Sequence, residues 1–196
     1  MSELEDFTSN IETQFCFNEN YKQSGSMHSL FMLQGLLEED FLLLESDLLF
    51  EEEALISILN EQTSDVLLIS GKTNSGDEVW IYGDKNSGIE SKGLIKKINK
   101  QVYKEQETIG ELTGISKISY ELFQKMCDHH SNKISLPNNF HYEECISDLC
   151  YQHEIKYLKI ENLIWTEIDD PQHYKRAVDE IWPLLMKKMS REFKKY

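Results

Sequence analysis

The sequence has 196 residues, and 40% of them are hydrophobic, so the chain can bury a substantial core as a single domain. Its net charge of −15 argues against non-specific nucleic-acid binding and against an anionic membrane surface, because both require a basic face. No apolar run is long enough to cross a bilayer, and the acidic N-terminus lacks the basic and apolar regions of a signal peptide. We therefore expect a cytoplasmic protein with neither a nucleic acid nor a membrane as partner.

The first third of the chain predicts strands and helices in turn. Ile11 to Phe17 alternates in the manner of a strand, and Met27 to Leu37 has the broad apolar face of a helix. Phe41 to Leu44 is a continuous apolar run, as expected for a strand covered on both faces. Glu51 to Glu53 place negative charge in the first turn of a helix that extends to Asn60, which favours a solvated helix start over a metal site.

The rest of the chain continues this alternation. Val66 to Ser70 predicts a second buried strand. Further strands are expected at Glu78–Tyr82, Leu94–Asn99, Leu112–Ile118 and Ile155–Ile160, with helices at Tyr120–His130 and Tyr142–Tyr151. We expect one α/β domain over residues 1–196, with a mixed, mostly parallel central sheet flanked by helices.

Near the C-terminus, the apolar segment from Leu163 leads into Asp169, Asp170 and Pro171. Asp169 is expected at the carboxyl end of a buried strand, where open α/β sheets bind ligands. Asp170 can accept hydrogen bonds from the first helical N–H groups, and Pro171 fits the first helical position. A plain strand, cap and helix is the alternative explanation. Later in this helix, Pro183 predicts a kink or break near Trp182.

A second carboxylate favours a metal site. Asp47 follows the strand Phe41 to Leu44 and therefore also lies at a strand's carboxyl end. Magnesium is usually held by one or two protein carboxylates and takes its other ligands from water and substrate phosphates. Asp47 and Asp169, from distant segments, could together hold one Mg²⁺ ion.

Two other clusters have competing explanations. A zinc site could be built from the region that contains Cys127, His129, His130, His141, Cys145, Cys150 and His153. These spacings match no zinc-finger pattern, and together with Cys16 the thiols fit reduced, packed cysteines without a disulfide. The basic cluster Lys92, Lys96, Lys97 and Lys100 favours a solvated strand edge over phosphate binding.

Several motifs follow one another along the chain, at Tyr21–Leu30, Asp40–Phe50, Gly110–Ile115, His141–Glu144 and Trp165–Asp170. Their order resembles that of the sugar-phosphate and choline-phosphate nucleotidyltransferases. The resemblance implies a mixed α/β sheet that binds a nucleoside triphosphate, whose α-phosphorus is attacked by a phosphorylated acceptor with release of pyrophosphate. The acceptor would be a sugar phosphate, phosphocholine or a phosphonate. The family's catalytic, Mg²⁺-binding aspartates correspond to Asp47 and Asp169.

The same resemblance implies four acceptor-side residues. Glu111 and Gly114 correspond to the family's acceptor-side strand and turn, although a β-bulge or tight packing would also explain the glycine. Tyr142 and Glu143 resemble an acceptor-side pair at a helix start, for which helix capping and core packing are the alternatives.

The chain departs from the family at its start. It contains no glycine-rich loop with arginine and no Pro-Lys segment, and an opening βαβ unit of roughly 30 residues has no counterpart. An enzyme cut short, or completed by an N-terminal partner, is one explanation. A catalytically silent binding protein is the other, and homodimerisation is expected under both, because a missing edge unit exposes apolar sheet surface.

Overall fold

The computed structural model describes residues 12–86, 89–101, 108–132 and 139–192. Its strands are β1 (Phe41–Leu44), β2 (Leu48–Phe50), β3 (Val66–Ser70), β4 (Trp80–Asn86), β5 (Ile89–Asn99), β6 (Gly110–Ile118), β7 (Lys156–Ile160) and β8 (Trp165–Glu167). Its helices are α2 (Ser26–Phe31), α3 (Glu53–Leu59), α4 (Tyr120–Asn132), α5 (Tyr142–Leu149), α6 (Pro171–Arg176), a π-helical turn η1 (Ala177–Ile181) and α7 (Trp182–Glu192). The strands and helices are interleaved along the chain, which confirms the expected mixed α/β fold.

Six strands form the central sheet in the order β1-β6-β3-β7-β5-β4. Among the described strands only β3 and β7 are parallel neighbours, and all other pairs in this sheet are antiparallel. The expectation that parallel pairing would dominate is therefore wrong. The long strand β6 lies antiparallel between β1 and β3, and β4 and β5 pair with each other as antiparallel neighbours.

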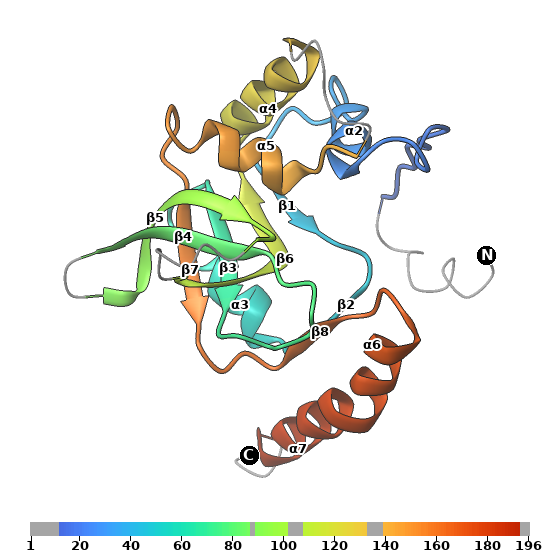
Figure 1. The fold of residues 1–196 in the computed structure, drawn as a ribbon, viewed down its shortest axis with the longest axis vertical. Helices are drawn as coiled ribbons and strands as arrows, with labels where there is room; N and C mark the ends of the chain where they lie inside the picture. The colour runs from blue at the N-terminus through green and yellow to red at the C-terminus, as the bar shows by residue number, and fades with distance from the viewer. Residues whose placement is uncertain (1–11, 87–88, 102–107, 133–138, 193–196) are drawn as a thin grey trace.

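Strand β3 is central, and both of its faces are buried. Leu67 and Ile69 belong to the larger core, on the side covered by α2, α4 and α5, whereas Val66 and Leu68 belong to a smaller core under α3 (Figure 1). Successive strand residues point to opposite faces, so an uninterrupted apolar run is the pattern that this position requires.

A second, two-stranded sheet joins β2 to β8 in antiparallel register, with Leu48 opposite Glu167. The strand that precedes Asp169 is therefore not part of the central sheet, contrary to expectation. The ladder continues for one more hydrogen bond, from the Ile168 N–H to the Asp47 carbonyl, at 2.9 Å. This pairing brings together two segments that are more than 100 residues apart in sequence.

The C-terminal helices extend away from the sheet (Figure 1). Asp170 caps α6, as expected, and accepts hydrogen bonds from the N–H groups of Gln172 and His173. The helix is interrupted as predicted near Trp182, where the π-helical turn η1 precedes Pro183. Proline cannot donate the helical hydrogen bond, so the turn before it loses its regular partner.

Two expectations for the N-terminal region are wrong. Residues 12–17 form no strand and are exposed, and Ile11 lies outside the described residues. Helix α2 ends at Phe31 rather than extending to Leu37. Alternating hydrophobicity indicates a strand only when a neighbouring strand supplies hydrogen bonds, and Phe15 and Phe17 have no such neighbouring strand here.

In the part of the chain that the structure describes, no helix is long and apolar enough to cross a membrane.

Candidate functional site

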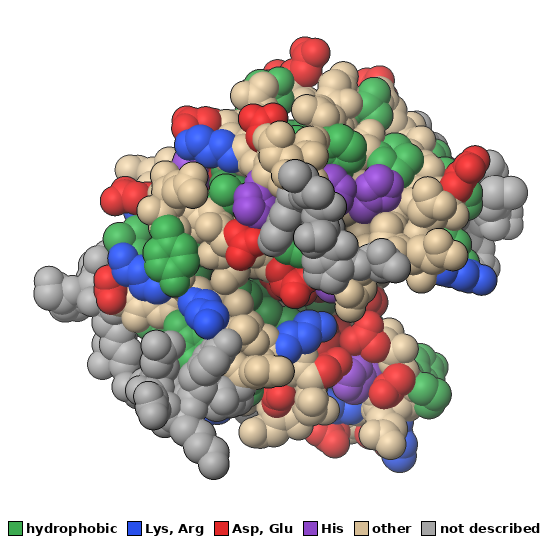
Figure 2. Space-filling model, turned by 45° about the horizontal axis from the view of Figure 1, so that its top comes forward, with side chains coloured by type: hydrophobic (Ala, Val, Ile, Leu, Met, Phe, Trp, Pro, Cys, Tyr) green, Lys and Arg blue, Asp and Glu red, His purple; other side chains and the backbone are tan. Residues whose placement is uncertain are grey.

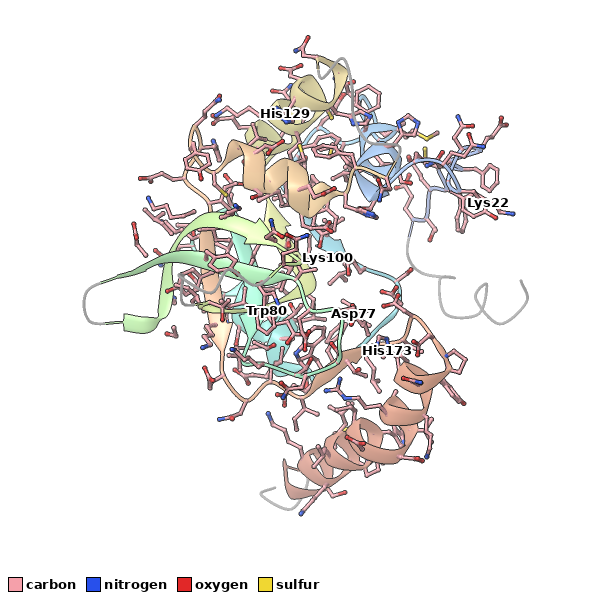
Figure 3. All side chains as sticks on the ribbon, viewed as in Figure 1. Lys22, Asp77, Trp80, Lys100, His129 and His173 are labelled. Atoms are coloured by element: carbon pink, nitrogen blue, oxygen red, sulfur yellow. The ribbon has the colours of Figure 1, made fainter. Side chains whose placement is uncertain are left out.

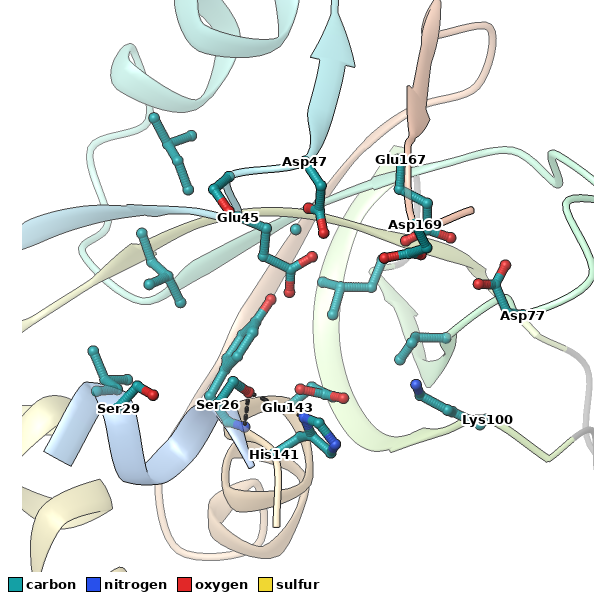
Figure 4. A pocket seen from close by; sticks show the side chains of 18 of the residues that line it. Ser26, Ser29, Glu45, Asp47, Asp77, Lys100, His141, Glu143, Glu167 and Asp169 are labelled. Atoms are coloured by element: carbon teal, nitrogen blue, oxygen red, sulfur yellow. Dashed lines mark hydrogen bonds between the residues drawn. The ribbon is translucent and has the colours of Figure 1, made fainter. Parts of the chain in front are cut away.

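A cavity of about 610 Å³ opens between the β1–β2 loop, strand β6, the start of α5 and the segment that follows β8. All six residues that the sequence singled out line it: Asp47, Glu111, Gly114, Tyr142, Glu143 and Asp169. In a space-filling view, acidic side chains gather around the hollow between the helical layer and the C-terminal helices (Figure 2). Figure 4 shows the carboxylates of this cavity from close by.

Asp47 and Asp169 lie together because β2 pairs with β8. The Asp47 carbonyl accepts from Ile168, the residue before Asp169, so both side chains emerge at the same end of the small sheet. The Asp47 Oδ1 atom is buried and has no hydrogen-bond partner. The pKa of Asp169 is raised by partial burial and by the negative charges of Asp47 and Asp77. A divalent cation would satisfy the unpaired oxygen and relieve the repulsion, so the pair fits Mg²⁺.

Glu45, which the sequence analysis did not single out, also lines the cavity. Its backbone N–H binds the Gly114 carbonyl at 3.1 Å, and Gly114 has a φ of +74°. A Cβ atom on Gly114 would lie 2.5 Å from Glu45 Oε2, so this glycine serves both the backbone conformation and the space for Glu45. Burial raises the pKa of Glu45, while the adjacent Tyr142 hydroxyl lowers it.

The start of α5 forms the opposite wall. The helix end is capped by its neighbours, since Ser26 Oγ accepts from the Tyr142 N–H and Glu144 accepts from the His141 N–H. Tyr142 and Glu143 are themselves buried: Tyr142 packs in the core and also lines the cavity. Burial raises the pKa of Glu143.

Lys100 follows β5 and extends toward Glu143, whose pKa its positive charge lowers (Figure 4). The other members of the basic cluster behave differently. Lys92 pairs with Glu61, and Lys96 pairs with Asp84 at 3.3 Å on the sheet surface. Lys96 is solvated, as the favoured interpretation expects, but β5 lies between β7 and β4 and is therefore not an edge strand. Lys100 faces the cavity.

Glu111 is buried and already engaged. Its two carboxylate oxygens accept from the backbone N–H and the hydroxyl of Thr73, each at 2.8 Å. These bonds attach the β3–β4 loop to strand β6. Of the four predicted acceptor-side residues, Glu111 is thus the one whose side chain is already engaged, and its hydrogen bonds position the loop.

That loop carries Asp77 into a second group of side chains that the sequence did not reveal. Ligand atoms of Asp77, Glu167, Asp169 and His173 all lie within 4.8 Å of one another. Figure 3 shows Asp77 beside His173 at the start of α6. The pKa of Glu167 is raised to about 8, first by burial and then by Asp77. One sequence signal was available: Glu167 and Asp169 are two residues apart, and strand residues at that spacing share a face.

Among the described residues, eight acidic side chains line the cavity, together with one lysine, Lys100. The zinc alternative fails in the same part of the chain, because no three of the seven Cys and His residues bring ligand atoms together. Cys127 is fully buried, and burial raises the pKa of its thiol to about 11. With its eight acidic side chains, the cavity instead offers hard oxygen ligands and a strongly negative electrostatic field.

No protein-family model matches the sequence. Solved structures do match it. The inositol-1-phosphate CTP transferase from T. maritima has 20% identity and a TM-score of 0.66, covering 92% of this chain and 70% of that chain. A UDP-glucose pyrophosphorylase has 12% identity and a TM-score of 0.68, covering 93% and 73%. The CTP:phosphocholine cytidylyltransferase from Streptococcus pneumoniae has 14% identity and a TM-score of 0.62, covering 90% and 72%. The chain therefore has the fold of these nucleotidyltransferases, as the order of its motifs predicted.

Proposed function

We propose that this protein is a magnesium-dependent nucleotidyltransferase domain. It would transfer a nucleoside monophosphate from a nucleoside triphosphate to a phosphorylated acceptor and release pyrophosphate. Two independent lines support the proposal: the fold is that of known nucleotidyltransferases, and Asp47 and Asp169 line one cavity at adjoining positions. The alternative, a catalytically silent binding protein, would keep the fold without the transfer.

The observation that carries the proposal is the register of β2 with β8. The hydrogen bond between the Asp47 carbonyl and the Ile168 N–H fixes Asp47 beside Asp169, and Asp47 Oδ1 is left buried without a partner. A helix cap or a structural ion pair would satisfy this oxygen, but neither is present among the described residues. Carboxylates at such positions are the ligands that Mg²⁺ uses beside substrate phosphates.

For this reaction the protein has to position the acceptor phosphate and the triphosphate and to neutralise their negative charge. An oxygen of the acceptor's phosphate forms a bond to the α-phosphorus of the triphosphate, and the bond to the pyrophosphate oxygen breaks. Bound Mg²⁺ would neutralise the negative charge that the reacting phosphates bring together. Lys100 would provide a further positive charge, and no side chain needs to form a covalent bond.

The carboxylates also favour one kind of acceptor. Glu45, which is half-buried, and Glu143, which is buried, are acids with raised pKa values that line the cavity with Tyr142. A glucose phosphate would bring no positive charge to this wall. A cationic head group, as in phosphocholine, would neutralise it and can lie against an aromatic ring. We therefore favour a positively charged phosphorylated acceptor over a neutral sugar phosphate.

Thermal melting with ligands tests the function. Mg²⁺ with the correct one of the four common nucleoside triphosphates should raise the melting temperature, because a ligand that binds only the native state stabilises it. Asp47→Asn and Asp169→Asn should abolish this rise. Asp128→Asn, an exposed change on α4, is the matched control and should keep it. If no triphosphate raises the melting temperature of the wild-type protein, the result contradicts the activity of this chain by itself and favours the silent alternative.

A paired measurement tests the acceptor. With Mg²⁺ and the triphosphate present, phosphocholine should form pyrophosphate faster than glucose 1-phosphate does, and Glu45→Gln should reduce the difference. Equal rates for the two acceptors would contradict the charge argument but leave the transferase assignment intact.

A further inference from the structure

The β3–β4 loop, strand β8 and helix α6 converge on the outer side of the Asp47–Asp169 pair. Asp77 comes from the loop, Glu167 ends β8, and His173 lies in the first turn of α6. Asp169, between β8 and α6, is the fourth member. A group of acidic residues alone does not make a metal site, so the histidine decides what this group can do.

His173 is 8% exposed, and its Nδ1 atom has no hydrogen-bond partner. Nδ1 lies 3.7 Å from Asp169 Oδ2, and Nε2 lies 3.8 Å from Asp77 Oδ1. A ring N–H that donates to a carboxylate lies about 2.7–2.9 Å from the oxygen. The ring instead lies between two oxygens at distances too long for hydrogen bonds, which is unusual for a buried polar group.

The dimensions suit a metal ion. Ligand atoms that surround one ion at about 2.1 Å lie roughly 3–4.2 Å from one another. The four ligand atoms here are already within 4.8 Å, so small side-chain movements would complete the sphere. The ion would take one nitrogen of the His173 ring, and the other nitrogen would remain free to donate to a carboxylate.

We propose that Asp77, Glu167, Asp169 and His173 form a second cation site, which takes a first-row transition-metal dication such as Mn²⁺, Co²⁺ or Zn²⁺ in preference to Mg²⁺. Three carboxylates and one imidazole form a donor set that these ions accept, whereas Mg²⁺ prefers an all-oxygen shell. Asp169 belongs to both groups, so its two oxygens can serve one cation each, as bridging carboxylates do in two-metal sites.

The site does not depend on the proposed transferase activity, so its test uses metal and protein alone. Free Mn²⁺ is measured by electron paramagnetic resonance during titration of the full chain. His173→Gln should weaken Mn²⁺ binding by about tenfold or more, the scale on which residues that support a metal act. His129→Gln, on α4 beside Asp148, should leave Mn²⁺ binding unchanged.

Cobalt gives a direct signature. Wild-type protein with Co²⁺ should show a strongly shifted imidazole N–H resonance in the proton spectrum, and His173→Gln should lack it. Asp77→Asn is the second variant, for use in case His173→Gln disturbs folding. It changes a half-exposed loop side chain and should also weaken Mn²⁺ binding. Wild-type protein that takes up no Mn²⁺ or Co²⁺ would overturn the site, as would Mn²⁺ affinity equal to that of the wild type in both His173→Gln and Asp77→Asn.

Failure of this site and failure of the transferase proposal are distinguishable. If the second site is absent, wild-type protein can still show the Mg²⁺ and triphosphate melting shift through Asp47 and Asp169. If the transferase proposal fails, Mn²⁺ binding that depends on His173 remains measurable without any nucleotide.

Discussion

Asp169 and Asp170 are adjacent in sequence and have opposite surroundings. Asp170 accepts hydrogen bonds from Gln172 and His173 at the start of α6, and these bonds lower its pKa. Asp169 points into the cavity, where burial and the charges of Asp47 and Asp77 raise its pKa. One carboxylate is satisfied by the fold, whereas the other lies among carboxylates that repel it, where we propose a cation.

The contrast extends through the molecule. Asp40 accepts from the Tyr120 N–H at the start of α4, which lowers its pKa in the same way. Around the cavity, Glu45, Glu143 and Glu167 all have raised pKa values, and burial is the largest cause in each case. The fold therefore uses acids at helix starts for stability and concentrates unsatisfied acids where function is proposed.

The largest expected effect separates the two adjacent aspartates. Asp169→Asn should reduce the rate of nucleotidyl transfer by roughly a thousandfold, since loss of a metal contact removes several kcal/mol of transition-state stabilisation. Asp170→Asn keeps the capping oxygen and should retain nearly all activity. Pyrophosphate release measured under Mg²⁺ would check both. Similar losses in the two variants would contradict the division of roles.

The next effect concerns the positive charge in the cavity. Lys100→Gln should raise the KM for the triphosphate by about tenfold, the effect of losing roughly 1.4 kcal/mol of charge-assisted binding. Lys96→Gln, which removes a surface pair with Asp84, is the control and should leave KM unchanged. A Lys100→Gln variant with wild-type KM would place the triphosphate elsewhere.

For the free energy of unfolding, we expect the change at Asp170 to have a larger effect than the change at Asp169, the reverse of their order for activity. Asp170→Ala removes the cap of α6 and should cost about 1 kcal/mol of unfolding free energy. Asp169→Ala removes a repelled carboxylate and should cost nothing or stabilise the protein. Urea unfolding of the two variants without metal gives the comparison, which fails if Asp169→Ala is the less stable of the two.

The last comparison concerns a pH dependence. The pKa of Glu167 is about 8 in the folded protein, above its ordinary value of 4.5, so the folded state binds the extra proton. The resulting stability is fully present below about pH 4.5 and is lost as the pH rises through 8. In the presence of EDTA, melting temperatures across this range should fall less for Glu167→Gln than for the wild type. Parallel curves would show that Glu167 is not held protonated.

The sequence predicted Asp47 and Asp169 for a reason that is only half correct. Both follow strands, but β8 belongs to a small separate sheet, and its pairing with β2 is what brings the aspartates together. A three-residue strand carries no signal for its partner, so this pairing was not predictable from periodicity. Most other elements were predictable because their apolar patterns are long and regular.

The missed residues share a different cause. Asp77 lines the cavity because Glu111 attaches its loop to β6, and His173 comes beside Asp77 from a short capped helix. Such contacts depend on tertiary structure, and local patterns do not contain them. The opening βαβ unit, an N-terminal partner and the homodimer stay predictions of the family resemblance and of edge exposure.

A double-mutant cycle on Asp47 and Asp169 tests the central claim, that two distant segments hold one cation, most directly. The Mg²⁺-dependent transfer rate is measured for wild-type protein, Asp47→Asn, Asp169→Asn and the double variant. If both carboxylates serve one ion, each single change removes most of the rate and the second adds little. Fully additive losses, or a wild-type rate in either single variant, would contradict the shared site.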